Sequence, residues 1–317
     1  MSVIVGIDVG GSSQTAVAFD LFGEVKAQVH QEATSRGGDD VLANLLSLLE
    51  QLGPVEIVAV GIGIPGQVDP AVGEVRTAVN LGIGDEPYPL AASLQEKLGC
   101  PVIVENDVRT AALGLYEELA TGSSVTLVNI GTGIAAGVAI DGEAMRGAHG
   151  MAGEIGHLVM EENGTLCRCG QHGCLEAIAA GPAIARAWPA AEQSATALFA
   201  AAAEGDEAAQ RIADRVASHL ATALTWLAAT YDTEHVIIGG GVSRAGIPLL
   251  EAIRAQLDKR GADSEIAARR LRPSQITLVE PDSLAGPRGA WVLARRSIFE
   301  RRESPVGTRN PNKGAAV

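Results

Sequence analysis

Residues 167–174 read Cys167-Arg168-Cys169-Gly170-Gln171-His172-Gly173-Cys174, and a little earlier the chain reads Gly153-Glu154-Ile155-Gly156-His157. Three of the four cysteines of the protein lie in this short stretch. Three thiolates spaced C-x-C-x4-C with an outlying imidazole are typical of a tetrahedral zinc site. A disulfide is the alternative, but two cysteines spaced C-x-C are too close for an easy bridge. The stretch therefore predicts a zinc ion, with His157 or His172 as its fourth ligand.

Two carboxylates, Glu154 and Glu176, lie beside this expected metal site. An ionised carboxylate accepts hydrogen bonds from hydroxyl groups, so both side chains are suited to binding a sugar. We therefore expect the zinc ion to brace a substrate site.

Composition and charge limit the classes of function. The chain has 317 residues, enough for one large domain or two ordinary ones. Its 24 basic and 38 acidic residues give a net charge of −14, which disfavours binding to nucleic acid or to an anionic membrane. The first residues do not resemble a signal peptide, and no apolar stretch predicts a transmembrane helix. We expect a soluble, cytoplasmic protein with reduced thiols and no nucleic-acid or membrane partner.

Strand and helix patterns alternate along the chain, which is typical of the α/β class. The expected strands are Val3–Asp8, Ala16–Asp20, Glu24–His30, Val55–Ile64, Pro101–Glu105, Ser124–Ile130, Ile134–Ile140, His235–Ile238 and Gln275–Val279. The expected helices are Val41–Leu52, Asp107–Ala120, an amphipathic helix through Ile212 and Leu227 that ends near Asp232, Ser243–Lys259 and Leu284–Arg296. We predict two α/β lobes, residues 1–118 with the helix at 284–300 and residues 119–283, followed by disorder over 301–317.

Three glycine-rich turns follow expected strands: Asp8-Val9-Gly10-Gly11-Ser12-Ser13, Gly131-Thr132-Gly133 and Gly239-Gly240-Gly241. The exposed N–H groups of such turns suit phosphate oxygens, and the third turn also precedes a helix N-terminus. Each turn alone fits an ordinary hairpin equally well. Together they favour a nucleotide in a cleft between the lobes, and a carboxylate beside its phosphates, Asp8, indicates Mg²⁺.

Another glycine motif, Gly61-Ile62-Gly63-Ile64-Pro65-Gly66, matches the spacing of a dinucleotide fingerprint. That fingerprint must open a helix, whereas residues 67–70 predict extended chain or a turn, so we exclude NAD. A P-loop lysine motif is also absent from the sequence. Backbone groups and a metal ion must then hold the phosphates.

Asp107 stands at a strand-to-helix junction within Glu105-Asn106-Asp107. Asn and Asp are favoured helix N-caps, so a purely structural role is one interpretation. The carboxyl end of a strand is also where open α/β sheets bind ligands, and a helix N-terminus keeps a carboxylate ionised. Asp107 is therefore a candidate base that accepts a proton from an alcohol.

Taken together, these motifs resemble those of the ROK family (repressors, open reading frames, kinases), over residues 3 to about 297. The resemblance implies the fold of the actin-like ATPases, in which two ribonuclease-H-like lobes flank the active-site cleft. It also implies ATP-dependent phosphorylation of a hexose at its 6-hydroxyl, with glucose as the first expectation, and a homodimer. N-acetylmannosamine, N-acetylglucosamine, mannose and allose are the alternative substrates.

The resemblance assigns roles to individual residues, with Asp107 as the catalytic base. The implied sugar contacts are Gly66, Asn80, Asn106, Asp107, Glu154, His157 and Glu176. The implied ATP contacts are Asp8, Gly10, Gly11, Ser12, Gly131, Thr132, Gly133, Gly240 and Gly241. The implied zinc ligands are His157, Cys167, Cys169 and Cys174, which excludes His172.

The sequence departs from the family pattern at several positions. Ser12 stands where a threonine is usual and keeps its hydroxyl. Many glucokinases of the family carry a Trp soon after the equivalent of Asn80, and this chain does not, which bears on the choice of hexose. Arg109 replaces a residue that is commonly small or an amide. The family also contains repressors with an N-terminal helix-turn-helix, for which we expect no room before Asp8.

Overall fold

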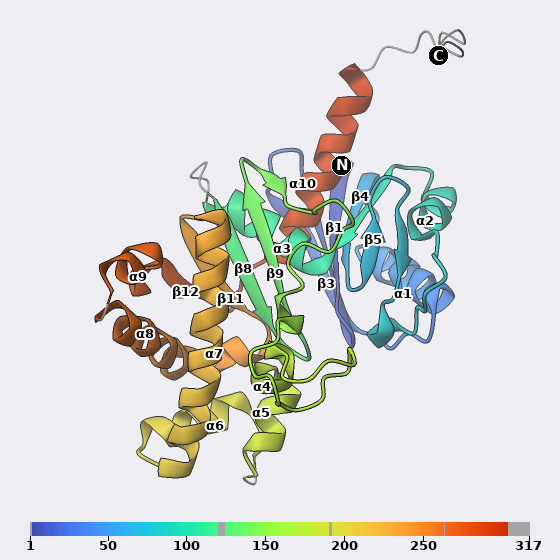
Figure 1. Cartoon of the computed structure of the whole chain (residues 1–317). Coiled ribbons are helices and arrows are strands. Elements are labelled where there is room, and N and C mark those ends of the chain that lie inside the picture. The colour runs from blue at the N-terminus through green and yellow to red at the C-terminus, as the bar shows by residue number, and fades with distance from the viewer. Residues whose placement is uncertain (1, 120–123, 190–191, 263, 304–317) are drawn as a thin grey trace, which may run out of the picture.

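The computed structural model describes residues 2–119, 124–189, 192–262 and 264–303 (Figure 1). Its first sheet has the strand order β3-β2-β1-β4-β7. These strands are β1 Ser2–Val9, β2 Ser13–Phe19, β3 Val25–Glu32, β4 Glu56–Ile64 and β7 Val102–Asn106. β1, β4 and β7 run parallel, whereas β2 and β3 form an antiparallel hairpin extension. β1 is buried along nearly its whole length because it is the middle strand with helices on both faces.

A second sheet repeats this plan with the order β10-β9-β8-β11-β12. Its strands are β8 Val125–Ile130, β9 Ile134–Ile140, β10 Glu143–Ala144, β11 His235–Gly239 and β12 Ile276–Leu278. Here β8 pairs antiparallel with β9, which in turn pairs with β10. On its other side β8 pairs parallel with β11, and β11 pairs parallel with β12. We call each sheet with its own covering helices a lobe.

Outer helices cover each sheet on the side away from the other lobe (Figure 1). In the first lobe these are α1 Gly38–Glu50 and α2 Leu90–Leu98, whose leucines share a core with β1 and β4. In the second lobe α7 Glu207–Tyr231 and α8 Gly246–Ala262 share a core with β8 and β11. The shorter helices of this lobe are α4 Leu175–Ala179, α5 Gly181–Ala187, α6 Ala195–Ala203 and α9 Glu265–Arg270. A short hairpin, β5 Gln67–Asp69 and β6 Glu74–Arg76, extends the first lobe.

Two helices, α3 Asp107–Leu119 and α10 Ala285–Glu303, lie between the sheets (Figure 1). α3 packs Ala112 and Leu115 in one core with β8, whereas α10 packs Trp291 against the first sheet. The two helices approach each other closely at Gly114, where an added Cβ would lie 1.8 Å from the backbone oxygen of Ala285. This packing fixes the N-terminus of α3 between the two lobes.

The structure confirms the predicted α/β class and all nine predicted strands, with shifts of a few residues at their ends. The helix expected from Ser243 begins instead at Gly246, because residues 241–245 form a 3₁₀ turn. α10 runs to Glu303, three residues past the start of the segment predicted to be disordered. The rest of that prediction, 304–317, lies outside the described residues. The lobe boundary at residue 118 stays a prediction.

Among the described residues, no helix is both long enough and apolar enough to cross a bilayer.

Candidate active site

A cleft of about 1610 Å³ lies where the two lobes meet, and residues from both line it. Every residue that the sequence suggested as a sugar or ATP contact lies on its wall. The first lobe contributes Asp8, Gly10, Gly11, Ser12, Gly66, Asn80, Asn106 and Asp107, and the second contributes Gly131, Thr132, Gly133, Glu154, His157, Glu176, Gly240 and Gly241. The structure thus gathers residues spread over more than two hundred positions of sequence into one site.

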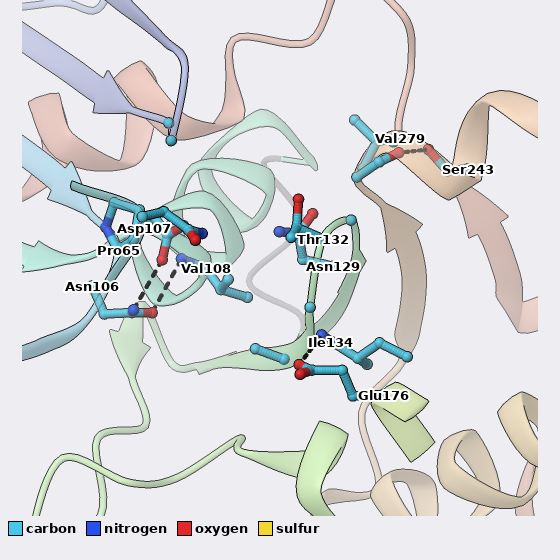
Figure 2. Close-up of a pocket in the computed structure, with 18 of the residues that line it drawn as sticks. Pro65, Asn106, Asp107, Val108, Asn129, Thr132, Ile134, Glu176, Ser243 and Val279 are labelled. Atoms are coloured by element: carbon cyan, nitrogen blue, oxygen red, sulfur yellow. Dashed lines mark hydrogen bonds between the residues drawn. The ribbon is translucent and has the colours of Figure 1, made fainter. Parts of the chain in front are cut away.

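Asp107 is the first residue of α3 and faces the cleft beside Asn106 (Figure 2). The Asn106 side chain organises this corner: its Nδ2 donates to Asp107 Oδ1 at 2.9 Å and to the backbone oxygen of Gly66 at 3.3 Å. Its Oδ1 accepts from the N–H groups of Val108 and Arg109, at 3.1 and 3.2 Å. Asn106 is therefore the side chain that caps α3. The Asp107 carboxylate itself lines the cleft.

The environment of Asp107 favours a carboxyl group that exchanges protons near neutral pH. Desolvation raises the pKa of Asp107 from its usual 3.8 to about 6, against the opposing effect of nearby N–H groups and Arg109. Desolvation, followed by the negative charge of Asp107, likewise raises the pKa of Asp8 to about 7. Two carboxylates that repel each other in one cleft form a place that a divalent cation would stabilise.

The glycine turns face each other across the same space. Gly10 donates its N–H to Ser13 at 2.7 Å, and Gly131 donates its N–H to Gly133 at 2.9 Å, so each turn closes on itself. Gly11 packs against Asn80, since an added Cβ would lie 3.3 Å from the Asn80 Cβ. Turns of this kind, lining a cleft, are suited to bind an anion through backbone N–H groups.

Acidic and imidazole side chains of the second lobe line the same cleft as Asp107, and Figure 2 shows Glu176 across from it. Glu154 precedes the 3₁₀ turn Ile155–His157, and residues three apart in such a turn share a side, so Glu154 and His157 both face the cleft. Glu176 is 8 % exposed at the start of α4, where Oε2 accepts from the Ile134 N–H at 3.2 Å. Arg168 Nε lies 2.8 Å from the other carboxylate oxygen of Glu176.

The predicted metal-ligand set comes together behind this wall. One ligand atom from each of His157, Cys167, Cys169 and Cys174 lies within 4.8 Å of the others. Cys169 Sγ is 3.7 Å from Cys174 Sγ, and Cys167 Sγ is 3.7 Å from His157 Nδ1. Zinc–sulfur bonds of about 2.3 Å in a tetrahedron place two sulfurs about 3.8 Å apart, so the group fits zinc. His172 instead places Nδ1 3.1 Å from the Gly164 oxygen, outside the group.

Part of the cleft was not expected from the sequence. Arg168, Arg244 and Ile247 line it, as do Gln67, Met151 and residues 277–281, which run from β12 into the segment after it. Arg168 lies between two predicted zinc ligands, so its position in the motif could have pointed to the site. The wall at residues 277–281 had no such signal, because only its place at the end of a parallel strand brings it here.

Comparison with known proteins identifies the family. The model of the ROK family matches residues 4–297. The chain is 33% identical to a glucokinase of Halalkalibacterium halodurans over 281 residues, covering 80% of this chain and 84% of the relative. It is 31% identical to an N-acetylmannosamine kinase of Escherichia coli over 255 residues, covering 79% of this chain and 87% of that protein.

Solved structures of the same family share this fold. A ROK hexokinase from Thermus thermophilus is 30% identical with a TM-score of 0.76, covering 94% of this chain and 99% of that one. A ROK family glucokinase from Streptomyces griseus, in complex with glucose and AMPPNP, is 27% identical with a TM-score of 0.75, covering 93% and 99%. A ROK family transcriptional regulator homologous to Escherichia coli MLC is 25% identical with a TM-score of 0.78, covering 94% and 79%. With the family pattern matched over residues 4–297 and the fold shared throughout, the chain belongs to the ROK family.

Proposed function

We propose that this protein transfers the γ-phosphoryl group of ATP to the 6-hydroxyl of a hexose. The observation that carries the proposal is the Asp107 carboxylate, which faces the glycine turns across the cleft with a pKa raised to about 6. Relatives with glucokinase and N-acetylmannosamine kinase activity support a sugar as the acceptor. The glucose and AMPPNP bound to a neighbour of the same fold support ATP as the donor.

In this proposal the residues of the cleft position the reactants and stabilise charge, as phosphoryl transfer requires. Asn106, Glu154, His157 and Glu176 bind ring hydroxyls, with Gly66 and Asn80 beside them, so that one hydroxyl points towards Asp107. Asp107 accepts the proton of that hydroxyl as it attacks. The turns at 10–12, 131–133 and 240–241 donate N–H groups to the phosphates.

Two metal ions complete the proposed site. Mg²⁺ would neutralise charge on the transferred phosphoryl group, and Asp8 is the carboxylate placed to hold it through water. Zn²⁺ would be structural, bound by His157, Cys167, Cys169 and Cys174 with no position left for water. Because Cys167 lies near Nδ1 of His157, the Nε2 atom of that ring is left to meet a sugar hydroxyl.

Glucose is expected to be the best acceptor in a panel of hexoses that also contains mannose, allose, N-acetylmannosamine and N-acetylglucosamine. The N-acetylated sugars should have values of kcat/KM lower by about tenfold or more, the scale of one poorly fitted group in a pocket. ADP release coupled to a reporter enzyme measures this directly. A higher kcat/KM for N-acetylmannosamine or N-acetylglucosamine would transfer the assignment to that sugar. Sugar binding without ADP release from any member would instead indicate a sensor or a repressor core.

The pH dependence of activity should report Asp107. A base must be deprotonated to accept a proton, so kcat/KM should fall as the pH drops through about 6. If the base had the pKa of an ordinary aspartate, kcat/KM would stay unchanged down to about pH 4. Initial rates between pH 4.5 and 8.5, at saturating Mg²⁺, locate the midpoint, and a kcat/KM that stays constant down to pH 4.5 would contradict the proposed role of Asp107.

We also propose a cytoplasmic location and a homodimer. All four cysteines are free, as expected of a reducing compartment. Light scattering of the purified protein with and without sugar tests the dimer.

A further inference from the structure

Arg109 is a buried arginine next to the proposed catalytic base. It lies in the first turn of α3 and is 3 % exposed. Its Nε donates to Glu105 Oε1 at 3.0 Å, and its Nη1 donates to the backbone oxygen of Gly150 at 3.0 Å. Glu105 is fully buried at the end of β7, where its second oxygen pairs with Arg146. A planar guanidinium can serve both acceptors at once, which a shorter amide or an ammonium group cannot do.

Gly150 belongs to a segment that leaves one lobe and reaches the other, residues 145–153, which we call the crossing loop. Both ends of the crossing loop are bound to β9 of the second lobe: the Met145 N–H donates to Val138 at 2.8 Å, and the Gly153 oxygen accepts from Ala136 at 2.8 Å. Its middle is bound through Gly150 to Arg109, at the edge of the first lobe. The residue that follows the loop is Glu154.

A second contact holds the crossing loop to the first lobe. Gln67 of β5 places Nε2 3.2 Å from Met151 Sδ, and both residues line the cleft. Met151 is 47 % exposed and the amide–sulfur interaction is weak. The charged, buried contact of Arg109 is therefore the stronger of the two.

We propose that Arg109 is a positioning residue that fixes the crossing loop, and with it Glu154, at a set distance from Asn106 and Asp107. The inference rests on the proposed function, in which Glu154 binds the sugar and Asp107 accepts the proton of its hydroxyl. If both groups bind one small ring, the distance between them decides whether the hydroxyl is in line with the phosphate. A misplacement of about 1 Å can lower a rate about a hundredfold.

Arg109 also acts on Asp107 through charge. Glu105 is paired with two guanidinium groups, the buried Arg109 and the partly exposed Arg146, so the three side chains together carry a net positive charge. Desolvation and the negative charge of Glu154 raise the pKa of Asp107, whereas Arg109 of its own helix and the nearby backbone N–H groups lower it. Asp8 of β1 also faces Asp107, whose negative charge raises the pKa of Asp8. Removing the charge of Arg109 should therefore raise the pKa of Asp107 further.

Two variants separate position from charge. Arg109→Met removes both hydrogen bonds and the charge, whereas Arg109→Lys keeps the charge but cannot reach Glu105 and Gly150 together. Arg260→Met is the matched control, because Arg260 is a part-buried arginine that donates to Ser218 and Thr222, none of which lines the cleft. Each protein is assayed for kcat, for KM of sugar and of ATP, and for the pH midpoint of kcat/KM. Hydrogen exchange of the crossing loop is measured without substrate.

Both Arg109 variants should show kcat/KM for sugar lowered by about ten- to a hundredfold, with KM for ATP within twofold of the wild type. The amides of the crossing loop should exchange faster in both. The pH midpoint should move upward only in Arg109→Met. Arg260→Met should match the wild type in all of these, even if it melts at a lower temperature. If Arg109→Met does not fold, Arg109→Lys alone tests the positional part.

Two failures are distinguishable. A wild-type protein that phosphorylates no hexose overturns the proposed function, and the loop exchange rates then decide whether Arg109 holds the crossing loop. An active wild type whose Arg109→Lys variant has unchanged sugar kinetics and unchanged loop exchange overturns the positioning role alone.

Discussion

The Asp107→Asn protein is expected to bind sugar and ATP almost normally and to turn over about 10²–10⁴ times more slowly, the usual value of general-base assistance. Asparagine has nearly the same shape but cannot accept the proton of the attacking hydroxyl. The stability of α3 should not change, because the Asn106 side chain rather than that of residue 107 caps the helix. Single-turnover rates with calorimetry for each ligand separate chemistry from binding.

Thermal unfolding of this variant distinguishes a lost base from a damaged fold. A carboxyl group whose folded-state pKa is raised destabilises the folded protein once it ionises, so at pH 8 the neutral amide should not lower the melting temperature. Asp258→Asn, at an exposed position of α8, serves as the matched control and should keep wild-type turnover. If Asp107→Asn retains more than half of wild-type turnover, the proposed mechanism is wrong.

The Cys169→Ser protein is expected to lose its zinc and most of its sugar affinity together. A closed site with three thiolates and one imidazole should hold about one zinc ion per chain in the wild type. Without the ion the His157 ring loses its fixed orientation, and the segments that carry Glu154 and Glu176 lose a common anchor. Sugar affinity should fall by about ten- to a hundredfold. ATP is held by turns elsewhere and should bind nearly as before.

Elemental analysis and sugar-binding calorimetry on one preparation measure both effects. Cys100→Ser is the matched control, since Cys100 is a buried free cysteine outside the metal group, and it should retain zinc and sugar binding. Metal-free Cys169→Ser with normal sugar affinity would show that the cluster does not brace the site.

The strands and the glycine turns could be predicted because their signals are local. A buried parallel strand such as β4 is a continuous apolar run, and a turn such as Gly131–Gly133 is marked by its glycines. The helices α4 to α6 escaped prediction for a physical reason. They are short and rich in alanine, as in the segment Ala195–Ala203, so little contrast remains between a buried and an exposed face.

The site could be predicted where its residues form short motifs and not where the fold alone joins them. Asp107, Glu154 and the cysteines lie in recognisable patterns, and all of them are found at or beside the cleft. The hydrogen bond from Arg109 to Gly150 joins residues 41 positions apart, and neither segment has a sequence pattern that predicts this contact. The family resemblance implied only that Arg109 stands where a small residue or an amide is common.

The repeated strand order gives the molecule an approximate internal symmetry, but the two lobes differ in charge at one equivalent position. Asp8 pairs with Gly63 on its parallel neighbour and comes two residues before Gly10, while Asn129 pairs with Gly239 and comes two residues before Gly131. The two positions are equivalent, yet one holds a carboxylate and the other an amide. The turns after β1 and β8 therefore occupy equivalent places in the two lobes, but only the first has a carboxylate beside it. In the proposed site the carboxylate copy would suit a cation and the amide copy an anion, so the two turns would bind different parts of one phosphate chain.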